Sequence, residues 1–186
     1  GFERFIKSFL VTEPLYAGRF EQVWMWSDWP ERGTRPDHGI DLVARERDTG
    51  DLVAVQCKFF SPEAALPKGE IDSFLAESGK LPFRSRLLVT TAGRLNSAAE
   101  AAIENQQIPV NVIGLEDLVG STLDWAQFDP STPEVLTTLG RKRLRPHQRT
   151  AIDAVRAGFT EHDRGQLIMA CGTGKTFTSL RLAEEG

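Results

Sequence analysis

Three polar side chains between Gly39 and Phe60 (GIDLVARERDTGDLVAVQCKFF) have the types and spacing for metal-dependent phosphoester chemistry. Asp41 supplies a carboxylate, and Gln56 and Lys58 follow it in the next apolar run. Carboxylate and amide carbonyl oxygens are hard ligands suited to Mg²⁺. A lysine beside them can orient a water nucleophile or stabilise the charge that develops on a phosphate. The alternative interpretation is a polar sheet face with one surface ion pair.

A β-hairpin with its tip at Asp48 and Thr49 is expected to position these side chains. The flanking residues alternate between apolar and polar, and Asp48-Thr49-Gly50 is a turn sequence. Asp41 then faces Gln56 across the hairpin, with Lys58 next on the same face, whereas a three-residue turn would shift this opposition by one residue. The opposite face fixes this register, because a slip of one residue would bury the charges. That apolar face comprises Ile40, Leu42, Ala44, Val53, Val55 and Cys57.

Asp41 followed by Gln56-Cys57-Lys58 resembles the D…QxK form of the PD-(D/E)xK nucleases, in particular the Mrr-like branch. The resemblance covers about residues 1–120 and implies a metal-dependent phosphodiesterase that acts on DNA. Gln56 stands where many relatives have an acidic residue, and a neutral amide binds Mg²⁺ less strongly than a carboxylate. The resemblance therefore implies a further acid from the first helix, for which Glu3 is the matching candidate. An ordinary exposed helix glutamate is the alternative for Glu3.

The order of the predicted elements suits this nuclease fold. Apolar spacing predicts helices over 2–10, 69–80 and 96–107, the last capped by Asn96 or Ser97, and strands over 21–26, 86–93 and 109–114. The predicted fold class is α/β, with a mixed central sheet flanked by helices. Three tryptophans lie close together in WMWSDWP. We expect them in an aromatic core or a domain contact, with a DNA-stacking platform as the alternative.

A second motif, LIMACGTGKT (Leu167 to Thr176), has the composition of a phosphate-binding loop between a strand and a helix. Glycines let backbone N–H groups point at phosphate oxygens, while a lysine neutralises the β- and γ-phosphates and a threonine hydroxyl ligates Mg²⁺. Met169 stands where the strict pattern has glycine, and the looser form resembles motif I of superfamily 2 helicases and translocases. The predicted nucleotide-binding residues here are Gly172, Thr173, Gly174, Lys175 and Thr176.

Upstream, LRPHQ (Leu144 to Gln148) resembles the Q motif of the same superfamily, in which the Gln148 amide would read the edge of adenine. A plain helix start with Pro146 in its first turn is the alternative. A nuclease followed by these motifs resembles the N-terminal part of the single-polypeptide Type I (Type ISP) restriction-modification enzymes. The resemblance implies cleavage of double-stranded DNA coupled to ATP-dependent translocation, with ATP and Mg²⁺ as cofactors. It also implies methyltransferase and target-recognition modules downstream in the same chain.

These motifs predict three parts of the chain: an Mrr-like nuclease domain at 1–125, a linker at 126–143 and the truncated start of a RecA-like ATPase domain at 144–186. Prolines, small polar residues and a basic cluster mark the linker. Two other functions stay open. A nuclease-helicase of DNA repair or mobile-element defence would lack a downstream methyltransferase, and a non-catalytic DNA-binding module on a translocase would lack metal-dependent nicking.

The formal net charge of −4 is unevenly distributed along the 186 residues. Residues 1–125 hold 13 basic and 19 acidic side chains, a balance of −6, whereas residues 126–186 hold 9 and 7, a balance of +2. An acidic nuclease domain binds DNA phosphates weakly, so we expect another part of the protein to bring the DNA to it. We expect no membrane-spanning segment, because no apolar run is long enough for one, and we expect no signal peptide. Cys57 and Cys171 lie in unrelated motifs, which favours a reducing cytoplasm, and the histidines lack zinc-site spacing.

Overall fold

The computed structural model describes residues 1–35, 39–139, 144, 146–162, 164, 167 and 175–184. The chain divides into two compact units, Gly1–Leu139 and Gly140–Gly186. The described part of the predicted linker, residues 126–139, falls in the first unit, and the predicted domain limits stay a prediction. None of the described helices is long and apolar enough to cross a membrane.

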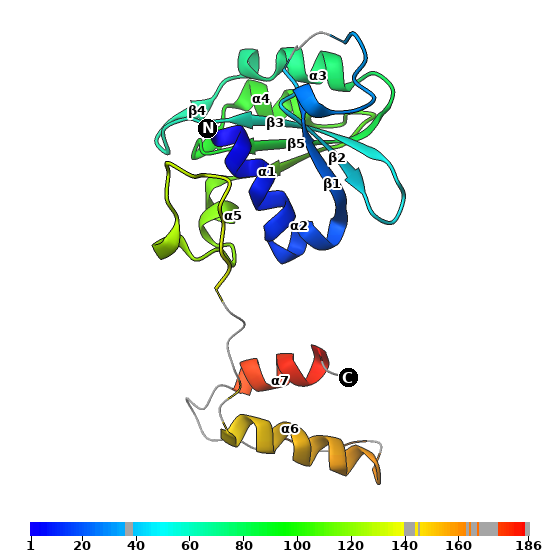
Figure 1. The fold of residues 1–186 in the computed structure, drawn as a ribbon, viewed down its shortest axis with the longest axis vertical. Helices are drawn as coiled ribbons and strands as arrows, with labels where there is room; N and C mark the ends of the chain where they lie inside the picture. The colour runs from blue at the N-terminus through cyan, green and yellow to red at the C-terminus, as the bar shows by residue number, and fades with distance from the viewer. Residues whose placement is uncertain are drawn as a thin grey trace. The chain divides into compact units, whose positions relative to one another are not determined.

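A five-stranded mixed sheet with the order β1-β2-β3-β5-β7 forms the centre of the first unit (Figure 1). β1 pairs with β2 and β2 with β3 in antiparallel fashion, whereas β3–β5 and β5–β7 are parallel. The parallel pairs bring the carboxyl ends of β3 and β5 to the same edge of the sheet. The strands are β1 (Phe20–Met25), β2 (Leu42–Glu46), β3 (Leu52–Lys58), β5 (Phe83–Thr90) and β7 (Val110–Ile113).

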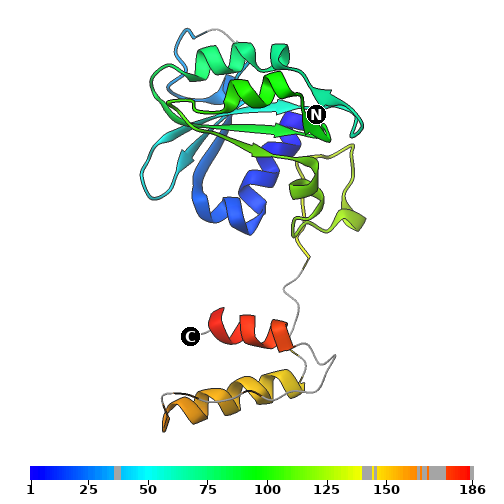
Figure 2. The same cartoon turned by 180° about the vertical axis from the view of Figure 1, so that it is seen from behind.

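Helices cover both faces of this sheet. α1 (Phe2–Thr12) and α2 (Pro14–Arg19) lie on one face. α3 (Asp72–Ser78) and α4 (Ser97–Ile103) lie side by side on the other face, as the view from behind shows (Figure 2). The predicted α/β class, a mixed sheet flanked by helices, is therefore confirmed. The remaining elements of this unit are short: the parallel pair β4 (Ala65–Leu66) and β6 (Arg94–Leu95), the helix α5 (Leu115–Val119), and the 3₁₀ turns η1 (Trp26–Asp28), η2 (Lys68–Glu70) and η3 (Trp125–Gln127).

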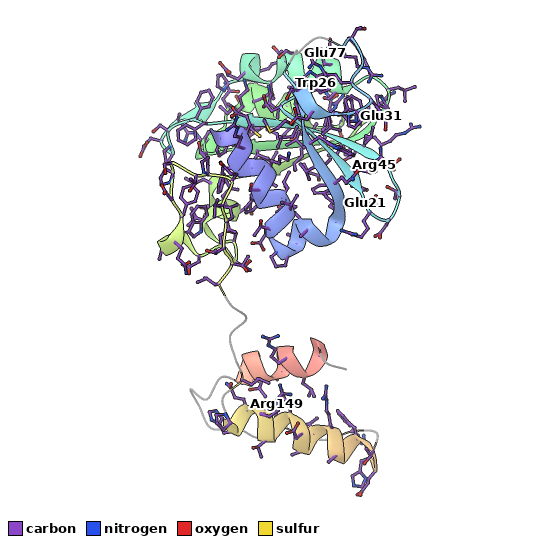
Figure 3. The ribbon with its side chains drawn as sticks, in the orientation of Figure 1. Glu21, Trp26, Glu31, Arg45, Glu77 and Arg149 are labelled. Atoms are coloured by element: carbon purple, nitrogen blue, oxygen red, sulfur yellow. The ribbon has the colours of Figure 1, made fainter. Side chains whose placement is uncertain are left out.

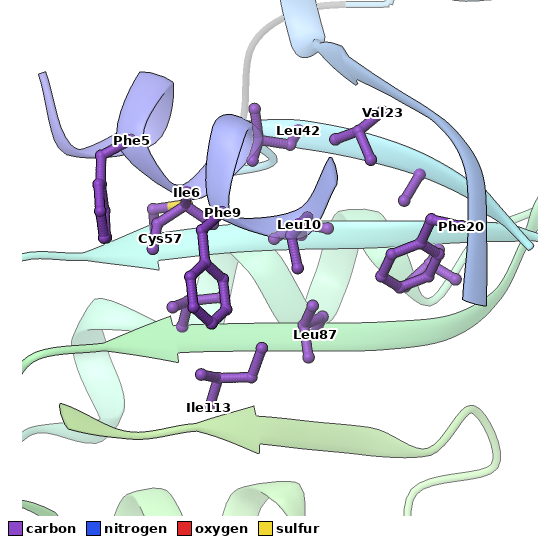
Figure 4. Packing of buried hydrophobic residues seen from close by; sticks show 14 of the residues in the cluster. Phe5, Ile6, Phe9, Leu10, Phe20, Val23, Leu42, Cys57, Leu87 and Ile113 are labelled. Atoms are coloured by element: carbon purple, nitrogen blue, oxygen red, sulfur yellow. The ribbon is translucent and has the colours of Figure 1, made fainter. Parts of the chain in front are cut away.

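α1 packs across the sheet because its apolar residues form one continuous stripe. Phe5, Ile6, Phe9 and Leu10 recur at helical spacing and are all buried. They contact the face of the sheet that carries the apolar residues of the hairpin (Figure 4). The fully apolar contact fixes α1 over β3, and hence places its first turn near the end of that strand.

The predicted hairpin register is confirmed. Leu42 pairs with Val55 and Ala44 with Val53, and their side chains lie in the α1 cluster together with Cys57. The prediction for Ile40 is wrong, because Ile40 packs on the other face with the tryptophan cluster. Pairing of β2 with β3 starts only at Leu42, so the strand alternation does not extend back to Ile40.

The tryptophans near β1 belong to a core, which confirms the first of the two interpretations. Trp26 and Trp29 are 6% and 2% exposed and contact each other in a tilted arrangement, with 5.5 Å between ring centroids. Arg45 lies over the ring of Trp24 at 5.5 Å. It also pairs with Glu31 at 2.8 Å, and both members of this ion pair are labelled in Figure 3. These rings are buried or covered by other side chains and pack against the edge of the sheet. They therefore have no open face on which a DNA base could stack.

Two predicted helices show how local signals set element ends. The side chain of Asn96 accepts a hydrogen bond from the Ala99 N–H at 2.8 Å, so Asn96 is the cap of α4 as predicted. The helix predicted over 69–80 is instead the 3₁₀ turn η2 followed by the shorter α3. Gly69 lies within the predicted first turn, and its low helix propensity favours the tighter turn there.

The second unit contains two described helices, α6 (Pro146–Phe159) and α7 (Lys175–Glu184). α6 begins at Pro146, as the first-turn proline predicts. α7 begins at Lys175, within the predicted phosphate-binding motif. Gly172, Thr173 and Gly174, predicted to cradle phosphates, lie outside the described residues.

Candidate active site

Asp41 lies at the point where β2 separates from β3. Its backbone N–H donates to the Val55 carbonyl at 2.9 Å, and its carbonyl accepts from the Trp26 N–H at 2.8 Å. Its side chain continues the ladder, because Oδ2 accepts a hydrogen bond from the Cys57 N–H at 2.6 Å. These three bonds hold the carboxylate at the carboxyl end of β3.

Gln56 brings an amide to the same end of the strand. The residue is 3% exposed, and its Oε1 is buried without a hydrogen-bond partner among the described residues. An unsatisfied buried carbonyl costs about 1–3 kcal/mol, which a bound cation would recover. The Asp41 carboxylate, directly before β2, and the unpartnered amide oxygen on β3 form a donor set that fits a hard divalent cation.

Gly39 lets the chain approach Gln56 and α3 closely. Its φ of +80° is in the region that L side chains rarely adopt. A Cβ at this position would lie 2.7 Å from Ser73 Oγ, 3.0 Å from the Phe74 nitrogen and 3.3 Å from Gln56 Nε2. The glycine of the GID sequence is therefore required by both conformation and space, and it sets the approach of Asp41 to β3.

Lys58 is the last residue of β3 and shares the face of Gln56. Its Nζ donates to Glu70 Oε2 at 3.0 Å, and the lysine side chain is 21% exposed. Glu70 lies in η2, twelve residues farther along the chain. Sequence reasoning missed Glu70, because no periodicity or motif marks a glutamate in this short connection.

Glu3 lies in the first turn of α1, which aromatic contacts hold near the end of β3. Phe2 stacks on Phe5 at 6.1 Å and contacts Phe59, the residue after Lys58, at 5.4 Å between ring centroids. Phe5 in turn contacts Phe128 at 5.4 Å. The role of Glu3 stays a prediction.

The pKa of the Cys57 thiol reflects burial and the charges near the carboxyl end of β3. Burial, followed by the carboxylates of Asp41 and Glu3, raises the pKa of Cys57 well above its ordinary value. The thiol is therefore neutral and unsuited to act as a nucleophile. Glu3 and Asp41 thus both contribute negative electrostatic potential at the Cys57 thiol.

Thr91 fixes the segment that follows Lys58. Its Oγ1 accepts from the Phe60 N–H at 2.8 Å and donates to the Phe60 carbonyl at 2.7 Å. The Thr91 N–H donates to the Lys58 carbonyl at 3.1 Å. The ends of β3 and β5 are thereby locked together beside the polar cluster.

The structure thus brings three of the predicted residues, Asp41, Gln56 and Lys58, to one edge of the sheet. Two oxygen donors for a cation and an adjacent ammonium group are the components that metal-assisted hydrolysis of a phosphodiester requires. In the second unit, Gln148 is buried at 5% exposure in α6. Lys175 and Thr176 open α7, so their backbone lies at a helix N-terminus, the position expected for a phosphate site.

Two family models match separate parts of the chain. Residues 11–135 match a family described as restriction endonuclease, and this match includes Asp41, Gln56 and Lys58. Residues 141–185 match a family described as the res subunit of Type III restriction enzymes. No curated protein matches the chain.

A solved structure described as the ATP-dependent Type ISP restriction-modification enzyme LlaBIII bound to DNA is 42% identical to the chain, with a TM-score of 0.82. The match covers 99% of this chain and 12% of that one. The MspJI restriction endonuclease in complex with an oligonucleotide is 18% identical over 62% of this chain and 25% of its own, with a TM-score of 0.39. A protein of unknown function, AF1548, is 19% identical over 84% of this chain and 78% of its own, with a TM-score of 0.46. The matches to the two families and to LlaBIII confirm the predicted resemblance to restriction-modification enzymes with a nuclease followed by a helicase-type segment.

Proposed function

The chain belongs to the restriction endonuclease family, and we propose that its first compact unit is a metal-dependent endonuclease that cleaves double-stranded DNA. This proposal rests on the arrangement at the end of β3, where Asp41, the unpartnered Gln56 oxygen and Lys58 lie at one edge of the sheet. The match to an enzyme whose structure is described as bound to DNA supports DNA as the substrate.

In this proposal Asp41 and Gln56 hold the cation, which is Mg²⁺, and Glu3 supplies a further oxygen from α1. A bound divalent cation polarises a phosphoryl oxygen and lowers the pKa of a bound water. Lys58 orients the attacking water and stabilises the negative charge that develops on the phosphate. The Cys57 N–H keeps the Asp41 carboxylate in one orientation, so that its position does not depend on the cation.

The second unit is the beginning of the part that supplies ATP-driven movement along DNA. We assign the nucleotide site to Gln148, Gly172, Thr173, Gly174, Lys175 and Thr176, with Thr176 as the Mg²⁺ ligand, on the pattern of these residues and on the match of 141–185 to a restriction-enzyme subunit family. Residues 1–125 form the nuclease, 126–143 the connection and 144–186 the start of the ATPase. The acidic balance of the nuclease fits this division of labour, because the motor delivers DNA that the nuclease holds weakly.

The chain spans 12% of the length of LlaBIII, so the remainder of the proposal concerns a longer protein. We infer that methyltransferase and target-recognition modules follow in the same polypeptide and that the protein works in the cytoplasm. The 42% identity to a Type ISP enzyme over nearly the whole chain supports this inference.

Lys58→Ala tests the proposed nuclease directly. Loss of one positioned cation should lower Mg²⁺-dependent cleavage of supercoiled DNA by about 10²–10³-fold in the full-length protein, with ATP hydrolysis unchanged. Lys80→Ala is the matched control, because Lys80 pairs with Glu77 on the surface and lies outside the cluster. If the Lys58 variant and its parent cleave at equal rates, with circular dichroism unchanged, Lys58 is not an active-site residue.

Gln56→Glu tests the proposed cation site. The substitution adds a charge to a pair of oxygen ligands, so we expect the nuclease to bind Mg²⁺ roughly tenfold more tightly. The parent should bind Mg²⁺ weakly, and the variant should gain more thermal stability from Mg²⁺ because the ion offsets the repulsion between two neighbouring carboxylates. Titration calorimetry and melting curves at pH 8 measure both effects. Tight binding by the parent, or no gain in the variant, would contradict the assignment.

A further inference from the structure

The Lys58–Glu70 ion pair joins two segments that no sequence motif connects. Glu70 Oε2 lies 3.0 Å from Lys58 Nζ. The ion pairs Lys68–Asp72 and Lys80–Glu77, which lie close to it in the chain, link residues four and three positions apart. Lys58–Glu70 instead connects the end of a central strand to the turn before α3.

The backbone of Glu70 is fixed to the same sheet that carries Lys58. The Glu70 N–H donates to the Pro67 carbonyl at 3.1 Å, and the next residue, Ile71, is fully buried. Ile71 packs with Leu66 and Leu88, and Leu88 lies on β5 beside β3. Glu70 is thus a partly exposed carboxylate on a fixed backbone, which is an arrangement that can hold a flexible partner.

Lys58 needs such a partner. A lysine ends in a point charge with three donors on a stem of four flexible carbons, so the strand alone does not fix its ammonium group. An exposed ion pair contributes little to stability, but it can restrict a side chain to one orientation. One donor bonded to Glu70 Oε2 leaves two donors for a water molecule and a phosphate oxygen.

We propose that Glu70 is a positioning residue of the active site, which holds the Lys58 ammonium group in the orientation for hydrolysis. This inference rests on the proposed nuclease function. Glu70 acts through Lys58, because its Oε2 accepts a hydrogen bond from the ammonium group.

The test compares Glu70→Gln, Lys58→Ala and the double variant in the full-length protein, with supercoiled DNA, ATP and Mg²⁺. Glu70→Gln should lower kcat about tenfold, the scale of a charge-assisted hydrogen bond that is partly exposed, and leave KM for DNA unchanged. The same substitution should have no further effect in the Lys58→Ala background, because residues that act through one another are not additive. Glu70→Asp, which keeps the charge, should recover part of the loss.

Asp72→Asn is the matched control. It breaks the Lys68–Asp72 pair in the same segment without touching Lys58, so cleavage should stay at the parent rate. The concentration of Mg²⁺ that gives half-maximal cleavage should be unchanged in Glu70→Gln.

Three results would overturn the proposal. They are an unchanged kcat in Glu70→Gln, an equal loss on top of Lys58→Ala, and a higher Mg²⁺ requirement that would make Glu70 a metal ligand. Asp41→Ala separates this failure from failure of the nuclease assignment. If Asp41→Ala is inactive while Glu70→Gln keeps its kcat, only the role of Glu70 is wrong; if Asp41→Ala cuts as its parent does, both are wrong.

Discussion

Asp41→Ala is expected to abolish Mg²⁺-dependent DNA cleavage by the full-length protein, by at least about 10³-fold, because several kcal/mol of charge stabilisation depend on a correctly held cation. Asp41 is the carboxylate that the hairpin itself contributes to the cluster, and Gln56 beside it is neutral. ATP hydrolysis should continue at the parent rate, since the nucleotide motif lies in the other unit.

The Asp41 side chain also has a structural role that the experiment must separate from catalysis. Alanine would leave the Cys57 N–H without its acceptor, which costs about 1–3 kcal/mol of folding stability. Asp41→Asn keeps an oxygen that accepts this hydrogen bond but removes the charge. We therefore expect Asp41→Asn to melt close to the parent and to cut as poorly as Asp41→Ala.

Asp48→Ala is the control for changes in the hairpin, because Asp48 is an exposed residue of the turn at its opposite end. Cleavage is measured on plasmid DNA with recognition sites, with ATP and a titration of Mg²⁺. Cleavage by a folded Asp41→Ala protein at the parent rate would show that the active site lies elsewhere.

Lys175→Ala is expected to stop both translocation and cleavage at a distance, although every residue of the nuclease cluster is intact. The lysine of a phosphate-binding loop neutralises the β- and γ-phosphates, so its loss should lower ATP hydrolysis by about 10²–10³-fold. The acidic nuclease depends on the motor for access to DNA, because its own charge opposes binding.

The two substitutions act as controls for each other. Loss of the motor should silence the nuclease, whereas loss of the nuclease in Asp41→Ala should spare the motor. ATP turnover is measured by phosphate release, and translocation by displacement of a bound strand. If Lys175→Ala protein cuts site-containing DNA with ATP as well as its parent, the proposed coupling is wrong.

The amino-acid sequence by itself determined the hairpin and its register. Alternation of apolar and polar residues on both sides of Asp48-Thr49-Gly50 allows one pairing that buries an apolar face, and the structure has that pairing from Leu42 to Arg45. The cap of α4 and the first residue of α6 were likewise predictable, because Asn96 and Pro146 act on the backbone of the first turn of their helices.

Only the tertiary structure decided how segments far apart in the chain meet at the candidate site. Glu70 reaches Lys58 because β4, η2 and α3 follow a particular path back over the sheet. Ile40 lies on the face opposite to the predicted one, since the chain leaves the ladder before it. Neither feature follows from a periodic pattern, because each depends on where the backbone turns after a strand ends.

Contacts at the end of the first unit join residues even farther apart in the chain, and local sequence patterns do not predict them either. Glu13, after α1, accepts hydrogen bonds at 2.8 Å from both the N–H and the hydroxyl of Thr122, 109 residues away. Leu123 pairs with Thr138, and Phe128 packs against Phe5, so residues up to 139 pack within the first compact unit. A local pattern encodes the repeat of a helix or a strand, whereas such contacts arise only when the whole chain closes around one core.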